Sequence, residues 1–352
     1  MKDEYFQYYI LSYFDLEKVT TESQIVHVIH AKRTPSMFYL IELNGWHHGF
    51  SLPNKISREQ LSKIIKVLLG DSYLIEKEKG YVLTEKGQLA CTEYFKQHYY
   101  PQKIKGFSKA KIRSPFWNRF QLFTQVFSEY SYQNTKYVPI VKHPHHQENI
   151  RQLFQQFSSN KEQLLVQWYT EQQFLFDQLD DQVADVLTNQ LTGHDFIGRT
   201  RSQLAAYYQM SPEEFSFYFR DAVEEVLQLI QQYTDQLPLN KEIVQILHLE
   251  THLGLSASTF KTYELIKQGA NLSEIARQRA IKENTVREHI LEMAFTFEHF
   301  PYQKFIPSDI YQSLNHCFDE VENFNYQKAV NEINQLEFMH YRLVELERMR
   351  LK

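Results

Sequence analysis

Apolar residues recur at helical spacing along most of this chain. In Thr21 to Ala31 and in Ser57 to Leu69 they return every three or four positions, which predicts two amphipathic helices. Pro35 suits the first turn of a third helix between them. Ser72 to Glu76 and Tyr81 to Thr84 are short extended runs joined by a turn, which predicts a hairpin. Three helices and a hairpin are the elements of a winged helix.

The same pattern predicts a mainly α protein with three domains. Residues 1–95 form a winged-helix-like domain, residues 96–236 a basic and then glutamine-rich helical middle region, and residues 239–352 a helix-turn-helix domain. Winged helices bind either DNA or protein, and both interpretations stay open for the first domain. Within the middle region, residues 202–215 have the capping residues of a second, weaker helix-turn-helix, with Ser211 as N-cap and Pro212 at the first helical position.

Ser256 to Ala294 has the residue order of a helix-turn-helix. Asn271 and Glu274 have the spacing of a capping box, so a helix begins there, and a tight turn near Ile281 precedes the next helix. The residues expected to face the core are Ile275, Ala276, Val286 and Ile290.

The start of the second of these helices is the predicted contact with base edges in the major groove of DNA. The side chains assigned to that contact are Lys282, Asn284, Thr285 and Arg287. Between Leu239 and Phe300 seven basic residues oppose eight acidic ones, and Glu283 and Glu288 flank the basic positions. The charge of this region therefore does not indicate whether it binds DNA. A trihelical unit that docks protein remains the alternative.

Lys96 to Arg151 is the most basic part of the chain, with ten basic residues against two acidic ones, a net charge of +8. Phosphate is the expected partner of such a segment. The candidate DNA-binding residues here are Lys103, Lys105, Lys109, Lys111, Arg113 and Arg119. Aromatic residues alternate with these charges, as in sites for single-stranded nucleic acid, but Phe116, Phe120, Phe123 and Phe127 follow helical spacing and are expected in the core.

Composition limits the class of protein. The 352 residues carry a net charge of −5, are 43% hydrophobic and include only ten glycines and ten prolines, which favours compact helical domains. Cys91 and Cys317 lie far apart and fit a reducing cytosol. We find no apolar leader and no run long enough to span a membrane, so a cytoplasmic, nucleoid-associated location without membrane contact is expected.

No motif supports catalysis, a cofactor or a metal ion. None of the ten glycines is followed by lysine, so the chain lacks the phosphate-binding loop of a helicase motor. His248 and His252 stand four positions apart, as on one helical face, but the glutamate between them is misplaced for a zinc protease. His143, His145 and His146 have no cysteine partners and are expected in a loop. We therefore predict a non-enzymatic protein.

Two sets of motifs resemble those of known groups. The first set is Glu274-Ile275-Ala276, Asn284-Thr285-Val286, His289-Ile290 and Tyr341-Arg342-Leu343-Val344-Glu345, and the second is Ser23-Gln24-Ile25-Val26-His27 and Phe116-Trp117-Asn118-Arg119. By the first set, Ser256 to Lys352 resembles the helix-turn-helix domain appended to many bacterial RecQ-type helicases. By the second, the rest of the chain resembles the YpbB family of Gram-positive bacteria.

The resemblance implies an accessory protein that binds single-stranded, duplex or forked DNA and works with a RecQ-type helicase in recombination or repair. Two alternatives stay open: an adaptor that binds only the helicase, and a helix-turn-helix transcription regulator with one preferred duplex sequence. The sequence does not indicate the oligomeric state, the pathway or which domain holds the helicase.

Overall fold

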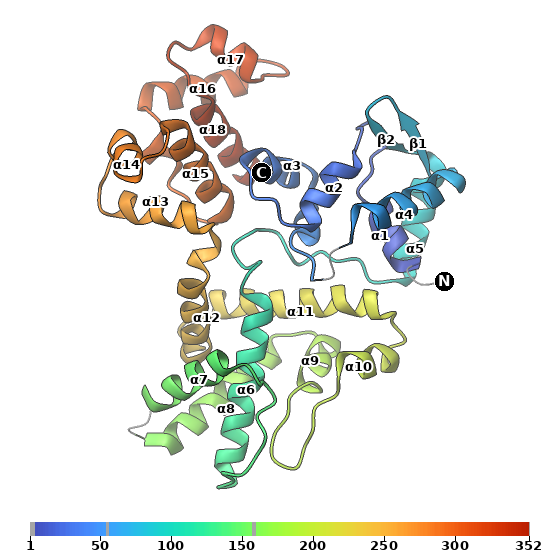
Figure 1. The fold of residues 1–352 in the computed structure, drawn as a ribbon, viewed down its shortest axis with the longest axis vertical. Helices are drawn as coiled ribbons and strands as arrows, with labels where there is room; N and C mark the ends of the chain where they lie inside the picture. The colour runs from blue at the N-terminus through green and yellow to red at the C-terminus, as the bar shows by residue number, and fades with distance from the viewer. Residues whose placement is uncertain (1–3, 54–55, 157–159, 352) are drawn as a thin grey trace. The chain divides into compact units, whose positions relative to one another are not determined.

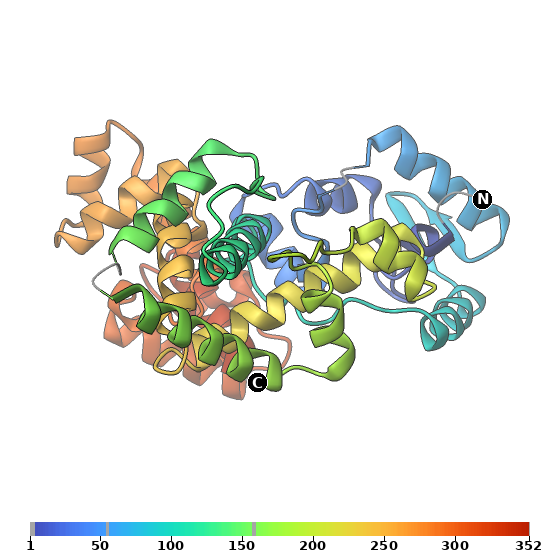
Figure 2. The same cartoon turned by 90° about the horizontal axis from the view of Figure 1, so that it is seen from below.

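The computed structural model describes residues 4–53, 56–156 and 160–351. The described chain is mainly α, as predicted, with one two-stranded antiparallel sheet (Figure 1 and Figure 2). Its contacts separate two compact units. The first unit comprises Met1–His30, His48–Lys105 and Lys109–Thr251, and the second comprises Ala31–His47, Gly106–Ser108 and His252–Lys352.

The N-terminal part of the first unit contains the helices and hairpin that the sequence predicts. Thr21 and Ser57 each begin a helix with a capping box, which confirms both predicted starts. Gly80 lies where a Cβ would be 2.6 Å from the carbonyl oxygen of Thr20, so glycine permits the close approach of the hairpin to the backbone at Thr20. The elements are α1 (Glu4–Leu11), α2 (Glu22–Ile29), α4 (Arg58–Gly70), β1 (Leu74–Lys77), β2 (Gly80–Leu83) and α5 (Glu85–Gln97), with Leu74 paired to Leu83 and Lys77 to Gly80.

The rest of the first unit is a helical assembly around α6 and α11. Its elements are α6 (Arg113–Ser131), α7 (Pro144–Gln156), α8 (Lys161–Asp177), α9 (Asp181–Thr188), α10 (Arg201–Tyr207), α11 (Pro212–Gln232) and α12 (Pro238–Glu250). Phe116, Phe120, Phe123 and Phe127 on α6 are buried, as their helical spacing predicts. Ser211 caps α11 and Pro212 occupies its first turn, also as predicted.

The second unit combines the helix-turn-helix with a helix from the first fifty residues. Its elements are α3 (Pro35–Asn44), the 3₁₀ turns η1 (Trp46–Gly49, whose last two residues belong to the first unit), η3 (His252–Gly254) and η4 (Tyr302–Phe305), and the helices α13 (Ala257–Lys267), α14 (Leu272–Arg279), α15 (Glu283–Thr296), α16 (Ser308–Glu320), α17 (Tyr326–Glu332) and α18 (Phe338–Leu351). Helix α15 is central, because α3, α13, α14 and α18 all pack against it.

The position of α3 departs from the predicted grouping of elements. All three helices and the hairpin expected in residues 1–95 form, but α3 lies in the second unit, where Phe38 is fully buried with its ring 5.8 Å from that of Phe295. Apolar spacing predicts that a segment is helical and has a face to bury. It does not say which distant segment will cover that face.

Candidate nucleic-acid interface

The helix-turn-helix forms as the sequence predicts. The side chain of Asn271 accepts a hydrogen bond from the Glu274 N–H, and the Glu274 carboxylate accepts one from the Asn271 N–H. Ala280 ends α14 in the left-handed conformation, with φ of 51°, and α15 begins three residues later. The predicted core residues Ile275, Ala276, Val286 and Ile290 are all buried.

Only the first two turns of α15 face solvent. From His289 to Thr296 every residue of the helix is buried, because neighbouring helices cover this half. At its start, Lys282 is the exposed N-cap residue, Asn284 is exposed and Thr285 is half-buried. The structure therefore brings the predicted contact residues together at one end of the helix. No side chain caps α15, in contrast to α13 and α14.

Arg287, the fourth predicted contact on α15, is bound by two carboxylates. Its Nε and Nη2 donate to the two oxygens of Glu337 at 2.5 and 2.6 Å, which is a bidentate pair. Its Nη1 lies 3.3 Å from an oxygen of Glu283, one helical turn earlier. These hydrogen bonds raise the pKa of Arg287 and lower the pKa of Glu337.

Glu283 also connects the two helices of the motif. The Ser273 hydroxyl on α14 donates to Glu283 at 2.5 Å, and this bond, followed by the bond from Arg287, lowers the pKa of Glu283. Glu283, one of the two acidic residues that flank the basic positions, thus holds the start of α15 against α14.

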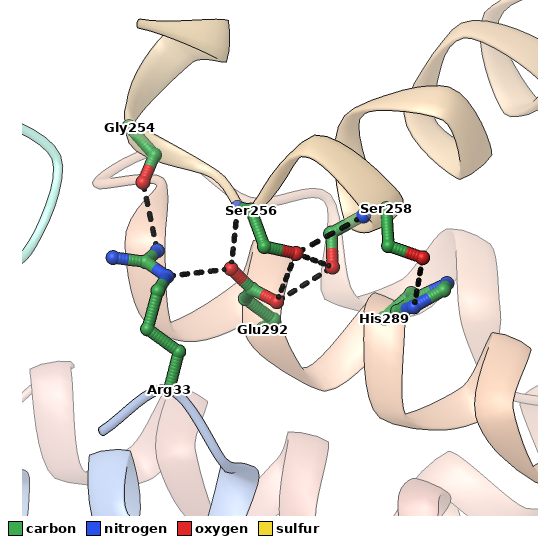
Figure 3. A network of polar contacts seen from close by, with 7 residues as sticks. Arg33, Gly254, Ser256, Ser258, His289 and Glu292 are labelled. Carbon is green, nitrogen blue, oxygen red and sulfur yellow. Dashed lines mark hydrogen bonds and ion pairs between the residues drawn. The ribbon is translucent and has the colours of Figure 1, made fainter. Parts of the chain in front are cut away.

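Behind this surface, buried polar contacts fix the start of α13 (Figure 3). Glu292 accepts bonds from the Ser256 N–H at 2.8 Å and from the Thr259 hydroxyl at 2.5 Å, and it pairs with Arg33 at 2.9 Å. Arg33 also donates to the carbonyl oxygen of Gly254 at 2.7 Å. Burial alone would raise the pKa of Glu292, but Arg33 and these hydrogen bonds outweigh it and lower the pKa.

His289 lies in a second network on the same side of α15 (Figure 3). Its Nδ1 is 2.8 Å from the Thr262 hydroxyl and its Nε2 is 3.3 Å from that of Ser258. Arg279 donates to both hydroxyl groups. Burial, together with the nearby Arg279, lowers the pKa of His289. The motif residue His289 therefore has a structural position between α13 and α15, away from the exposed end.

Four of the six candidate residues in the basic segment of the first unit pair with distant acidic residues. Arg113 pairs with Glu224 at 2.5 Å and Lys109 pairs with the same carboxylate at 3.7 Å. Arg119 pairs with Glu250 at 2.7 Å. All three basic side chains are buried, so they are not presented to a nucleic acid. This corrects their assignment to a DNA-binding surface: the acidic partners lie on α11 and α12, more than one hundred residues further along the chain.

The remaining predicted residues of this segment differ in exposure. Lys103 is half-buried and pairs with Glu225 at 3.0 Å, and its backbone N–H donates to Asp221. Lys105 and Lys111 are exposed. Of the six basic residues assigned to this site, two are therefore exposed.

The histidine candidates do not form a metal centre in the described chain. Helix α12 ends at Glu250 and His252 begins η3, so His248 and His252 do not share one helical face as expected. His145 and His146 lie in the first turn of α7, where a loop was expected. Among residues 4–53, 56–156 and 160–351, no group of three or more histidine, cysteine, aspartate or glutamate side chains could hold a metal ion.

Three residues of the second unit were missed by sequence analysis: Arg33, Glu292 and Glu337. The Glu283–Arg287 contact follows from four-residue spacing on a helix. The bond between Arg287 and Glu337 spans fifty residues and has no signal in the sequence. Across the described residues, we find no helix that is both long and apolar enough to cross a membrane.

Comparison with known proteins supports the helix-turn-helix domain and the resemblance of the chain to YpbB. A family model described as a helix-turn-helix domain matches residues 258–345. The chain is 24% identical to Protein YpbB of Bacillus subtilis (strain 168) over 311 residues, which covers 81% of this chain and 82% of that protein. No solved structure matches it. The resemblance read from the motifs is thereby confirmed: the chain is similar to YpbB over most of its length, and it carries a helix-turn-helix domain of the matched family in residues 258–345.

Proposed function

We propose that this chain is a DNA-binding protein and that the N-terminal end of α15 is its contact with the duplex. The observation that carries the proposal is the formed helix-turn-helix, with the solvent-exposed Lys282 and Asn284 at the start of its second helix. In helix-turn-helix proteins the second helix enters the major groove and its first residues touch base edges. The burial of α15 beyond Glu288 fits a helix that meets DNA by its end.

The helix N-terminus, Lys282 and Asn284 are the groups at this end that suit a phosphate or a base edge. The first N–H groups of a helix lack acceptors inside the helix and carry a partial positive charge, and here no side chain caps them. The ammonium group of Lys282 adds a full charge beside them. Asn284 has both a donor and an acceptor, the combination that recognises adenine in the major groove.

The proposal is tested by fluorescence anisotropy with labelled single-stranded, duplex and forked DNA across a salt series. Lys282→Ala with Asn284→Ala should weaken DNA binding by roughly 1 to 3 kcal/mol. It should also reduce the number of counterions released on binding, read from the salt dependence of the affinity, by about one. Lys63→Ala, which removes an exposed lysine from α4, is the matched control and should leave the affinity unchanged. Equal affinities for all three proteins would contradict the proposed contact, and strong preference for one duplex sequence would favour a transcription regulator.

We further propose that the chain works with a RecQ-type helicase in recombination or repair. The support is the resemblance of the motifs, together with the lack of a motor's phosphate-binding loop in this sequence. A motor would then act in trans. Co-purification of the full chain with the RecQ-type helicase of the same organism, and a change in that helicase's unwinding of forked DNA, are the expected results. If neither occurs, the accessory role is excluded while DNA binding can still stand.

A protein-only adaptor is the second candidate, and one surface of the first unit favours it. The segment between α9 and α10 presents Phe196 and Ile197 to solvent, with 53% and 87% of their surfaces exposed. This tip is held in place: His194 stacks on Tyr132 at 4.3 Å, and a Cβ on Gly198 would lie 2.4 Å from the Gln190 carbonyl oxygen. Exposed apolar residues on a well-fixed loop are typical of protein contacts.

The adaptor is tested with the same helicase. Phe196→Ser with Ile197→Ser should abolish co-purification and leave DNA affinity unchanged if the tip is the docking site. Leu249→Ser removes an equally exposed apolar side chain elsewhere and is the matched control. An adaptor without DNA affinity would retain the helicase but bind none of the three DNA forms at low salt.

A further inference from the structure

We propose that Glu337 competes with DNA for Arg287. The guanidinium group of Arg287 on α15 stays paired with Glu337 until a nucleic acid displaces the carboxylate. This inference rests on the proposed contact of α15 with DNA. It assigns a role to a residue outside the helix-turn-helix itself, in the connection between α17 and α18.

The geometry of the pair supplies the first argument. A guanidinium group that reads guanine or grips a phosphate uses two parallel N–H donors toward two acceptor oxygens or an oxygen and a nitrogen. Here Nε and Nη2 of Arg287 already donate to both oxygens of Glu337, at 2.6 Å or less. The carboxylate therefore occupies the arrangement that a nucleic acid would take.

The charge around the pair supplies the second argument. Glu283 is 3.3 Å from the remaining nitrogen of Arg287, so one cation faces two carboxylates and the cluster has a net charge of −1. An approaching phosphate is repelled by that charge. If Glu337 moved away, Arg287 and Glu283 would balance each other, and the net negative charge of the cluster would be removed.

The exposure of the pair supplies the third argument. The side chains of Arg287 and Glu337 are 21% and 37% exposed, so water and a ligand reach both. The pair of Arg113 and Glu224 has the same 2.5 Å contact but is 7% and 4% exposed. A partly exposed pair can exchange partners at modest cost, because water solvates the separated charges, whereas separating a buried pair leaves charges in a medium that solvates them poorly.

Glu337 also lies where movement is feasible. It follows α17, which ends at Glu332, and directly precedes Phe338, the first residue of α18. Between them Gln335 has a φ of 57°, a conformation that residues other than glycine seldom adopt. The segment from residue 333 to 337 is thus a short connection outside regular helix, and release of Glu337 requires no helix of the second unit to unfold.

The test is DNA affinity of the full-length Glu337→Gln variant, measured by anisotropy with labelled duplex and forked DNA. Glutamine keeps the shape and one hydrogen bond but removes the charge, so we expect about tenfold tighter binding and a salt slope steeper by about one ion. Arg287→Ala should weaken binding, and the double variant Arg287→Ala with Glu337→Gln should bind no tighter than Arg287→Ala alone. Glu320→Gln, which removes an exposed carboxylate at the end of α16, is the matched control for net charge.

The outcomes separate this inference from the proposed function. If the wild type binds DNA through α15 but Glu337→Gln leaves the affinity unchanged or lowers it, Glu337 orients Arg287 instead of competing, and the inference is overturned while the function stands. A gain that persists in the double variant, or that Glu320→Gln reproduces, also overturns it. If neither the wild type nor Glu337→Gln binds DNA, the proposed function fails and this inference fails with it.

Discussion

Two arginines of this chain pair with carboxylates at the same 2.5 Å distance but in different surroundings. Arg113 lies in the most basic stretch of the sequence and is buried against Glu224. Arg287 lies in a stretch where acidic residues outnumber basic ones, yet it is close enough to the surface to exchange its partner. The comparison shows that charge counted along a sequence is a poor measure of charge offered to a ligand, because folding brings partners from distant segments.

The largest effect should come from breaking the buried pair. Glu224→Ala removes the carboxylate that pairs with the buried Arg113 and Lys109, which should lower the free energy of unfolding of the first unit by about 3 to 5 kcal/mol. Urea denaturation followed by circular dichroism measures this. Glu93→Ala removes an exposed partner of Lys96 and should cost under about 1 kcal/mol. Similar costs for the two variants would contradict the buried role of Glu224.

Arg33→Ala should have a somewhat smaller effect on the second unit. It leaves Glu292 with its hydrogen bonds to Ser256 and Thr259 but without its cation, and it frees the carbonyl oxygen of Gly254. We expect the free energy of unfolding of the second unit to fall by about 2 to 4 kcal/mol, because the buried carboxylate of Glu292 loses its cation. Thermal unfolding with hydrogen exchange localised to α13 and α15 checks the prediction. Unchanged exchange there would show that the segment before α3 does not stabilise the helix-turn-helix.

The pair of Arg33 and Glu292 predicts how the stability of the second unit depends on pH. The pKa of Glu292 is lower in the folded chain than in the unfolded one, so its stabilisation is complete above the ordinary glutamate pKa and is lost as the pH falls through the folded value. Arg33 is the main group that lowers this pKa. The cost of Arg33→Ala should therefore shrink as the pH drops from 6 to below about 4. If the cost of Arg33→Ala in unfolding free energy stays constant over this range, Arg33 does not act through the ionised carboxylate of Glu292.

Much of the fold could be predicted from the sequence, since caps and periodicity are local. Ser211 and Asn271 begin helices where their capping residues indicate, the helices that begin at Thr21 and Ser57 follow the predicted apolar spacing, and so does the core face of α6. The partners of these elements are set by contacts between segments far apart in the chain. For this reason the sequence did not predict that α3 packs in the second unit.

The candidate site was predicted in part for the same reason. Lys282, Asn284 and Thr285 meet at the end of α15 because they are neighbours in sequence. The neutralisation of Arg113 by Glu224 depends on the packing of α6 against α11, and that of Arg287 by Glu337 on the connection to α18. Neither pair is visible in the local pattern of charges.

The smallest effect is expected from Lys105 and Lys111, the two exposed residues among the six candidates in the basic segment. Lys105→Gln with Lys111→Gln removes two surface charges and should weaken DNA binding by less than about threefold, with little change in stability. Anisotropy at low salt, where long-range attraction is strongest, is the suitable measurement. A loss of tenfold or more would restore the basic segment as the main DNA site.

Hydrogen–deuterium exchange of the full chain, with and without saturating forked DNA, tests most directly which region contacts the nucleic acid. Our account predicts that DNA slows exchange in the turn before α15 and in its first two turns, around residues 280–288. It predicts little change in residues 109–119, where Lys109, Arg113 and Arg119 are already paired with carboxylates. Slower exchange confined to residues 103–119, with none at the start of α15, would contradict the account.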